Sequence, residues 1–175
     1  MPHHVWDYSG IAEPRPYGPD TTYQLGMSWL AETCSSVEDW GCGYAYARRF
    51  APAGCIYTGV DASPGFADVV AELDGYTSSP DGILMRHVLE HNDVWRMVLE
   101  NALKSFRKRF ALVMFTPWTE NTFPLVPHEM LDIGFRKQDV TGYLEPFEVR
   151  EQHLVTATQY GQEHIFYVEH RDQSF

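Results

Sequence analysis

The sequence lacks the features that mark several large classes of protein. Its three cysteines, Cys34, Cys42 and Cys55, are an odd number without disulfide-like spacing among 175 residues. No apolar run approaches the roughly 20 residues that a membrane-spanning helix needs, and no secretory signal pattern opens the chain. These absences predict a cytoplasmic protein in a reducing setting, with no membrane segment and no disulfide framework.

Basic residues are also few. The chain has 13 Lys and Arg against 24 Asp and Glu, a formal net charge of −11. Nucleic-acid binding depends on Lys and Arg contacts to phosphates, so this balance argues against DNA or RNA as a partner. The one basic cluster, within residues 104–109, fits the end of a helix, where cations complement the helix dipole.

What the sequence does contain is enough apolar material for a core. Hydrophobic residues make up 44% and aromatic residues 14% of the chain, which excludes a disordered protein on composition. The length fits one domain over residues 1–175. There are no internal repeats and no low-complexity segments, and nothing indicates the oligomeric state.

Strand patterns alternate with helix patterns through most of the chain. The residues predict strands at 37–40, 56–60, 83–85 and 111–115, helices at 23–33, 44–50, 65–73, 94–106 and 139–144, and a hairpin of 149–158 with 164–170. An irregular aromatic arm occupies residues 1–21, and a Pro-broken loop occupies 116–134. We therefore expect a doubly wound α/β fold with a mostly parallel sheet and a C-terminal antiparallel β-hairpin.

The most informative segment is VEDWGCG at residues 37–43. A short strand runs into two glycines one residue apart, and a second apolar strand ends at Asp61, 20 residues after Gly41. Glycines allow a tight turn and a close approach of the backbone to a ligand, and a later acid accepts ribose hydroxyls. The spacing predicts a nucleotide-type pocket at the carboxyl edge of the sheet. It does not match a pyrophosphate-binding loop, because that loop has the pattern Gly-x-Gly-x-x-Gly and no glycine stands three residues after Gly43.

These residues resemble the class I S-adenosylmethionine-dependent methyltransferases. Two later segments are similar to the family as well: DGILMRHVLEH at residues 81–91 and the strand from Arg109 to Phe115 that leads into Thr116-Pro117. The resemblance covers residues 36–118 in the family's order. It departs from the family at Ala45, where a third glycine is usual and alanine adds only a methyl group near the helix start. It also departs in the short interval from Asp61 to Asp81, which leaves room for barely one helix and a vestigial third strand.

The resemblance implies S-adenosylmethionine as the cofactor and assigns roles to residues near the glycines. Gly41, Cys42 and Gly43 would line the cofactor with backbone, Asp39 would organise the loop or take the ammonium group, and Asp61 would accept from the ribose. The alternative for Asp61 is a turn residue. The full set of candidate cofactor-binding residues is Tyr23, Asp39, Gly41, Cys42, Gly43, Asp61, Ala62, Leu73, Asp74 and Arg86.

The candidate catalytic residues are His87 and His91. They follow a strand at the edge where α/β sheets bind ligands, and histidine is a suitable base for a hydroxyl acceptor near pH 7. The alternative is that both histidines are structural and cap the loop. Candidate acceptor-site residues are Tyr17 in the arm and Trp118 and Asn121 after the 111–115 strand.

The predicted activity is methyl transfer to oxygen or nitrogen of a small acceptor, such as a sugar or another metabolite. Residues 1–35 would form an arm and helix, 36–118 the cofactor-binding core, and 119–175 a substrate loop and the hairpin. One alternative is a catalytically idle protein that keeps the cofactor fold for an interaction. A remote alternative is a zinc peptidase through His87-x-x-Glu90-His91, although we expect no metal site because this segment runs from a strand into a turn.

Overall fold

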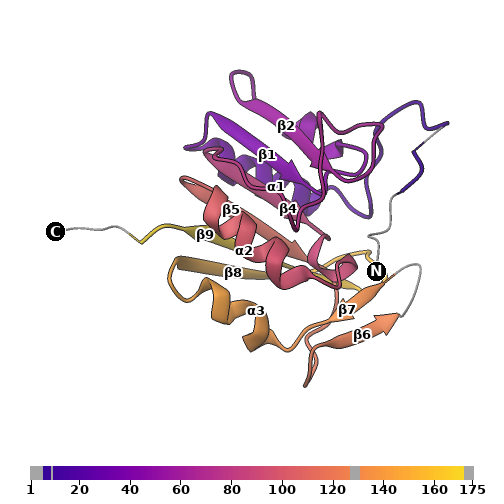
Figure 1. The fold of residues 1–175 in the computed structure, drawn as a ribbon, viewed down its shortest axis with the longest axis vertical. Coiled ribbons are helices and arrows are strands. Elements are labelled where there is room, and N and C mark those ends of the chain that lie inside the picture. The colour runs from indigo at the N-terminus through magenta and orange to yellow at the C-terminus, as the bar shows by residue number, and fades with distance from the viewer. Residues whose placement is uncertain (1–5, 9, 127–130, 172–175) are drawn as a thin grey trace.

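The computed structural model describes residues 6–8, 10–126 and 131–171, which form one α/β unit (Figure 1). The strands are β1 (Ser36–Trp40), β2 (Ile56–Asp61), β3 (Val69–Val70), β4 (Gly82–Arg86), β5 (Arg109–Met114), β6 (Phe123–Val126), β7 (Asp132–Gly134), β8 (Glu148–Val155) and β9 (Gln162–Glu169). The helices are α1 (Thr21–Ala31), α2 (Trp95–Ser105) and α3 (Lys137–Leu144), with short 3-10 helices η1 (Tyr46–Phe50) and η2 (Leu89–His91).

Seven strands form the central sheet in the order β3-β2-β1-β4-β5-β9-β8. The first five strands in this order are parallel, whereas β9 runs antiparallel to β5 and β8 runs antiparallel to β9. The order reverses between β1 and β4, so the carboxyl ends of these strands mark the switch point where open α/β sheets bind ligands. The predicted fold class, with its closing hairpin, is confirmed.

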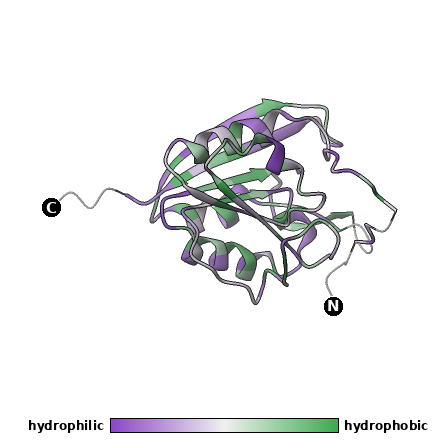
Figure 2. Ribbon diagram, turned by 90° about the horizontal axis from the view of Figure 1, so that it is seen from above, coloured by the Kyte–Doolittle hydropathy of each residue, from purple (hydrophilic) through white to green (hydrophobic). Residues whose placement is uncertain are grey.

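The sheet is buried on both faces, as parallel strands require. One face packs against α1, through Met27 and Leu30. The other face packs against α2 and carries most of the large core side chains, including Trp95, Phe110 and Phe166. Each such side chain contributes roughly 1.5–3 kcal/mol by leaving water. Figure 2 shows hydrophobic and hydrophilic residues together on the helices, which bury one side and expose the other.

The helix α2 follows from its sequence. Trp95, Val98, Leu99 and Ala102 recur at intervals of three and four residues, and all four are buried. The predicted helix at 94–106 is thus confirmed to within a residue at each end. None of the helices in the described parts of the chain is long and apolar enough to cross a bilayer.

The predicted helix at 65–73 is wrong, because this segment forms a turn and contains the two-residue strand β3. The carboxylate of Asp68 accepts the Gly59 amide at 2.7 Å, and the Asp68 amide donates to the Gly59 carbonyl at 2.9 Å. These bonds hold the chain beside β2 and compete with a helix. The third strand is therefore vestigial, as the short interval predicts.

Two other segments differ from their predictions. The helix at 44–50 is the 3-10 helix η1 and begins only at Tyr46. The loop at 116–134 contains a small antiparallel pair, β6 with β7, which packs beside the main sheet; residues 127–130 of this loop lie outside the described residues. The predicted hairpin turn is also shifted, since Glu163 lies within β9 and is fully buried.

Candidate active site

The loop after β1 makes a sharp turn at the carboxyl edge of the sheet. Gly41 and Gly43 have φ angles of 72° and 52°, which glycine adopts without steric cost. The amides of Gly41 and Cys42 donate to the Val60 carbonyl at the end of β2, at 2.7 and 3.1 Å. A Cβ atom on Gly41 would overlap the side chain of Val88. The loop is therefore fixed between β2 and the segment that follows β4.

Cys42 presents its backbone rather than its thiol to this edge. Its side chain is buried, and a Cβ atom on Gly59 would lie 2.9 Å from its sulfur. Burial raises the pKa of the thiol, and the nearby carboxylates Asp39 and Asp61 raise it further. The thiol is therefore protonated and packs against β2, which agrees with a backbone role for this residue.

Ala45 stands where the family's third glycine is usual, and its φ is 51°. The left-handed region costs a residue with a Cβ atom about 1–2 kcal/mol. The expectation that Ala45 adds only a methyl group was therefore incomplete, because the position also requires a strained backbone.

Asp61 joins the glycine loop to the loop after β2. Its two carboxylate oxygens accept the amides of Gly43, at 2.9 Å, and Ser63, at 2.7 Å. A carboxylate offers about four acceptor positions, so Asp61 retains the capacity to accept two further hydrogen bonds. This is the capacity that a ribose diol requires.

Asp39 is buried near the end of β1, and one side chain among the described residues donates a hydrogen bond to it. The hydroxyl of Tyr57 donates to Asp39 at 2.5 Å. Burial raises the pKa of Asp39 to about 7, with a further rise from Asp61, although the Tyr57 bond and Arg86 act in the opposite direction. A carboxyl group with this pKa exchanges its proton near neutral pH, as a group at a functional site often does.

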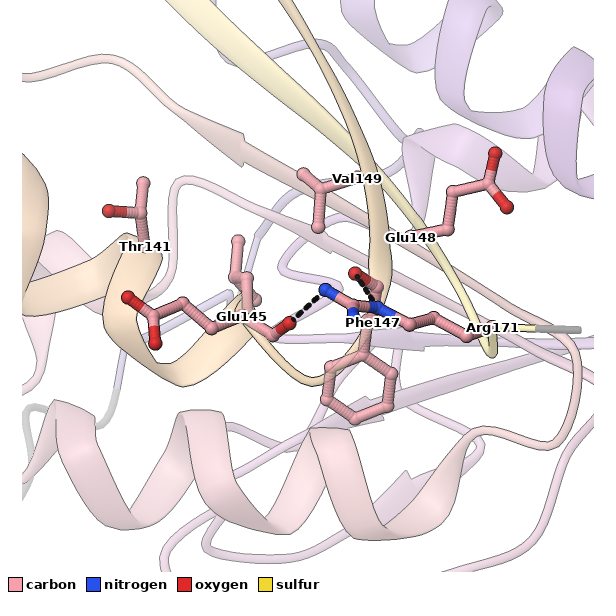
Figure 3. A pocket seen from close by; sticks show the side chains of 7 residues that line it. Thr141, Glu145, Phe147, Glu148, Val149 and Arg171 are labelled. Atoms are coloured by element: carbon pink, nitrogen blue, oxygen red, sulfur yellow. Dashed lines mark hydrogen bonds between the residues drawn. The ribbon is translucent and has the colours of Figure 1, made fainter. Parts of the chain in front are cut away.

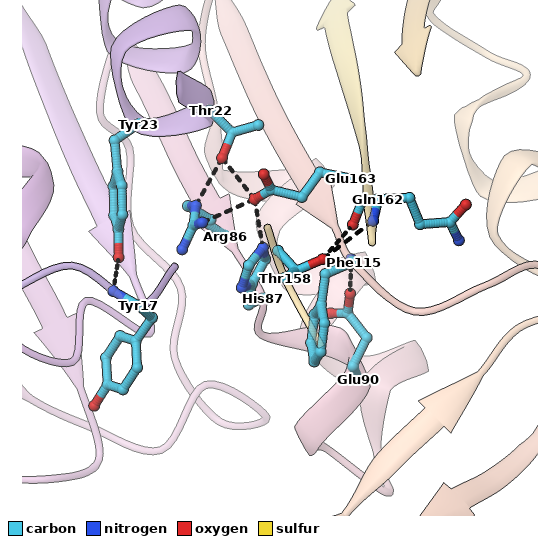
Figure 4. Close-up of polar contacts among 10 residues, drawn as sticks. All are labelled: Tyr17, Thr22, Tyr23, Arg86, His87, Glu90, Phe115, Thr158, Gln162 and Glu163. Atoms are coloured by element: carbon cyan, nitrogen blue, oxygen red, sulfur yellow. Dashed lines mark hydrogen bonds and ion pairs between the residues drawn. The ribbon is translucent and has the colours of Figure 1, made fainter. Parts of the chain in front are cut away.

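An aromatic arm covers the glycine loop. Tyr17 stacks on Tyr44 at 4.8 Å between ring centroids, and Tyr8 lies 4.9 Å from the same ring. A Cβ atom on Gly43 would lie 2.9 Å from the Tyr17 ring and 3.4 Å from the Tyr8 hydroxyl. The Tyr17 amide donates to the hydroxyl of buried Tyr23 (Figure 4). Tyr17 and Tyr23 thus both belong to the cover of the glycine loop.

A buried ionic network lies beside this cover (Figure 4). One oxygen of Glu163 accepts from the Thr22 hydroxyl at 2.7 Å and from the Arg86 guanidinium at 2.8 Å, and lies 2.7 Å from Nε2 of His87. The Arg86 guanidinium also lies 4.0 Å above the Tyr23 ring. Arg86 therefore neutralises Glu163 inside the protein, a role that its sequence position did not reveal.

His87 is held in this network. Burial lowers its pKa to about 4, although Glu163 acts in the opposite direction. Burial acts to raise the pKa of Glu163, but its bonds to His87 and Thr22 and the charge of Arg86 lower it overall. His87 is thus neutral at pH 7 and donates through Nε2 to an ionised carboxylate. Its φ of 56° is a strained value for a residue with a side chain.

His91 has different partners. Its Nδ1 lies 2.7 Å from the Leu131 carbonyl and 3.3 Å from Oδ1 of Asp132. Burial acts to lower its pKa, but the bonds to Asp132 and Leu131 raise it overall. The ring of Phe115 contacts both histidines, at 4.5 Å from His87 and 5.6 Å from His91. The structure thus brings the two predicted catalytic residues to one place and gives them opposite protonation behaviour.

The His87-x-x-Glu90-His91 segment does not form the helix that the zinc-peptidase motif requires. It passes from the end of β4 into η2, and Oε1 of Glu90 accepts the Phe115 amide at 2.6 Å. Within the described residues, no group of three or more His, Cys, Asp or Glu side chains is arranged to hold a metal ion. The zinc interpretation has no support in the geometry.

The remaining candidates lie farther from the histidines. Trp118 packs on His164, at 4.9 Å between rings, and Asn121 is exposed in the loop before β6. Leu73 is buried against α2, and Asn101 of α2 donates to the carbonyls of Leu73 and Asp74 at 3.0 and 2.8 Å. Ala62 is half-buried beside Asp61. Among the described residues, no ring contact or hydrogen bond joins Trp118 or Asn121 to either histidine.

A groove of about 810 Å³ lies at the opposite edge of the sheet (Figure 3). Its lining residues are Thr141, Leu144, Glu145, Phe147, Glu148, Val149 and Arg171. Arg171 spans it by donating to the carbonyls of Glu145 and Phe147. The groove is shared by the start of β8 and the chain after β9, away from the glycine loop, so its volume does not identify the site.

No protein-family model matches the chain, and no curated protein does either. Several solved structures do match the fold of the chain. Magnesium protoporphyrin IX methyltransferase from Synechocystis PCC 6803, with bound S-adenosylhomocysteine, is 17% identical with a TM-score of 0.67 over 87% of this chain and 83% of that chain. The 1,6-didemethyltoxoflavin-N1-methyltransferase of Burkholderia thailandensis is 16% identical, with a TM-score of 0.68 over 87% and 80%.

The N-methyltransferase NodS of Bradyrhizobium japonicum WM9 is 12% identical, with a TM-score of 0.64 over 97% of this chain and 95% of that chain. The chain has the class I methyltransferase fold. This fold confirms the architecture that residues 36–118 predict by resemblance, and it also confirms the predicted C-terminal hairpin.

Proposed function

We propose that the chain is an S-adenosylmethionine-dependent methyltransferase that acts on oxygen or nitrogen of a small acceptor in the cytoplasm. The observation that carries the proposal is Asp61. It ends β2, accepts the amides of Gly43 and Ser63, and keeps two acceptor positions free at the switch point of the sheet. Similar structures hold S-adenosylmethionine or S-adenosylhomocysteine in this fold.

The residues at this edge fit the cofactor chemically. Asp61 would accept from the ribose hydroxyls, Gly43 has no side chain that would keep a ligand from its backbone, and Asp39 would pair with the ammonium group. An ammonium partner favours the ionised form of Asp39, whose pKa burial raises to about 7 in the free protein. When bound, S-adenosylmethionine supplies a methyl group activated on a sulfonium sulfur.

The protein's own contribution would be positioning and exclusion of water. The glycine loop is fixed between Val60 and Val88, so the cofactor site is rigid. The arm already places Tyr8 and Tyr17 over Gly43, so these rings would move aside to admit the ligand and then cover it. Holding two reactants in line in a dry site supplies much of the rate gain in reactions of this kind.

The test is calorimetric titration of S-adenosylhomocysteine into the wild type and the Asp61→Ala variant. Loss of hydrogen bonds to a charged group should weaken binding by about 1.5–3 kcal/mol, or roughly 10–150-fold. The matched control is Glu100→Ala, which removes an exposed carboxylate on α2 that pairs with Lys104. Unchanged affinity in a folded Asp61→Ala protein would contradict the proposed role.

A second candidate function has one observation in its favour. Tyr8, Tyr17 and Tyr44 already pack together over the glycine loop in the free protein, which is the arrangement expected of an idle cofactor fold that serves an interaction. Binding of S-adenosylhomocysteine at micromolar concentration would support the enzyme, whereas a folded protein that fails to bind it would support the idle form.

A further inference from the structure

The hydrogen bonds of His91 fix which nitrogen carries its proton. A backbone carbonyl only accepts, so the 2.7 Å contact of Nδ1 with the Leu131 carbonyl requires a proton on Nδ1. The same N–H points to Oδ1 of Asp132 at 3.3 Å. In neutral His91 the lone pair therefore lies on Nε2. The His91 side chain is 34% exposed and that of Asp132 is 7% exposed, so the ring reaches solvent while its partner is shielded.

Asp132 is itself held in place. It begins β7, and its second oxygen accepts the Tyr160 hydroxyl at 2.9 Å. Burial acts to raise the pKa of Asp132, but the bonds from His91 and Tyr160 lower it overall. The carboxylate is thus ionised at neutral pH and has a bonding partner on each oxygen. Tyr160, Asp132 and His91 form a connected chain from the β8–β9 turn through β7 to η2.

His87 is less suited to the same part, because its neutral ring keeps a lone pair only on Nδ1 and its side chain is far less exposed than that of His91. Its Nε2 is committed to Glu163 at 2.7 Å, and its side chain is 11% exposed. Val88, which follows it directly, packs on Gly41 of the glycine loop. Because His91 lies only three residues beyond Val88, its Nε2, which has no hydrogen-bond partner among the described residues, belongs to the same edge as the glycine loop.

We propose, resting on the proposed methyltransferase function, that His91 is the base for the methyl acceptor and that Asp132, held by Tyr160, is its positioning residue. The acceptor O–H or N–H proton passes to Nε2 of His91. The acceptor lone pair forms the new bond to the methyl carbon while the carbon–sulfur bond breaks. The electron pair of that bond stays on sulfur, which becomes a neutral thioether. The protonated His91 then releases its proton to water.

The charges around His91 also restrict the acceptor. Asp132 faces it from β7, and Glu90 lies beside it in η2 with a pKa that burial raises to about 7, while the cation of Arg86 is neutralised by Glu163. Among the described residues, His87 and Tyr160 also lie nearby, and both are neutral at pH 7. An anionic acceptor would meet like charge here, so the site selects an uncharged or cationic molecule with an ionisable O–H or N–H group.

The first experiment measures the His91 imidazole by NMR in the full chain, with and without S-adenosylhomocysteine. The wild type should show the Nδ1–H tautomer when neutral and titrate above about 6.5, the ordinary histidine value. Asp132→Asn should lower this pKa, because the negative charge that favours imidazolium is lost. The matched control is Asp139→Asn, whose carboxylate bonds Thr122 and Arg136 instead. An Nε2–H tautomer, or a pKa that does not move in Asp132→Asn, would overturn the proposal.

The second experiment measures release of S-adenosylhomocysteine with a panel of phenols, sugars and heteroaromatic N–H compounds. Asp132→Asn should reduce turnover roughly 10–100-fold, shift the acid limb of the pH profile downward, and change S-adenosylhomocysteine affinity less than about twofold. Equal turnover across pH in both proteins, or turnover of none of the panel by a protein that binds S-adenosylhomocysteine, would overturn the proposal alone. Absence of S-adenosylhomocysteine binding would instead refute the proposed function, and this proposal with it.

Discussion

The two halves of the candidate site are built in different ways. In the cofactor half, Asp61 bonds backbone amides, and an aromatic arm lies over glycines. In the acceptor half, charged side chains bond one another: Arg86 with Glu163, and His91 with Asp132. The residues that Asp61 bonds lie 2 and 18 residues from it along the chain, whereas the ionic partners in the second half are 40 residues or more apart.

This difference in construction fits the two halves to different functions. A backbone cradle with small residues can be entered by a ligand that meets main-chain atoms. A network of buried side chains instead fixes protonation states, because each charge is set by its partner. The first half therefore suits recognition of a constant cofactor, and the second suits proton transfer from a particular acceptor.

The largest expected effect comes from breaking the acceptor-half network. Arg86→Met should destabilise the fold by about 3–5 kcal/mol, because it leaves the carboxylate of Glu163 buried and unpaired. The matched control is Arg48→Met, which breaks an ion pair of similar length with Asp68 at the surface and should cost below about 1 kcal/mol. Urea unfolding of both variants measures the difference. Equal losses of unfolding free energy in the two variants would show that the buried ion pair is no more important for stability than the surface pair.

A second prediction compares two buried carboxyls at opposite edges of the sheet. Burial raises the pKa of Asp39 to about 7, so the folded state loses stability relative to the unfolded chain as pH rises from about 4 to 7. Asparagine mimics the protonated acid and avoids this loss. The unfolding free energy of Asp39→Asn, relative to that of the wild type, should therefore rise by about 1–3 kcal/mol from pH 5 to pH 8.

Asp81 is the control for this prediction, because its bond from Lys108 lowers its pKa to about 2. Its stabilising effect is present above the unfolded value near 3.9 and is lost as pH falls toward 2. Asp81→Asn should destabilise the protein about equally at pH 5 and pH 8. If the two variants show the same pH dependence, the buried state of Asp39 is described wrongly.

The smallest expected effect concerns the strained backbone of the cofactor half. Ala45 has a φ of 51°, so Ala45→Gly should relieve about 1–2 kcal/mol of strain and lose about 0.4–1 kcal/mol through the greater entropy of the unfolded chain. A net stabilisation of up to about 1.5 kcal/mol should follow in urea unfolding. A loss of stability would show that the position tolerates a Cβ atom without strain.

The same division explains what the sequence could predict. The glycine loop and Asp61 are local signals, and the fold and its cofactor edge follow from them. The helix at 65–73 failed because Asp68 bonds back to Gly59, a contact that periodicity does not report. Glu163 was expected in a turn, and its burial depends on Arg86, which lies 77 residues away. Asp132 sits within a Pro-broken loop with no motif, so nothing local indicated that it meets His91.

We infer that the glycine loop holds the cofactor and that His91, at the same edge of the sheet, faces the methyl group of the cofactor. A crystal structure with S-adenosylhomocysteine tests it most directly. We expect the ribose hydroxyls to lie within hydrogen-bond distance of Asp61. We also expect Tyr8 and Tyr17 to cover the ligand and the thioether sulfur to face His91. Ligand density in the groove beside Glu148 and Arg171 would contradict the cofactor site proposed at the glycine loop. Density at the glycine loop with the sulfur turned away from His91 would contradict the proposed role of His91.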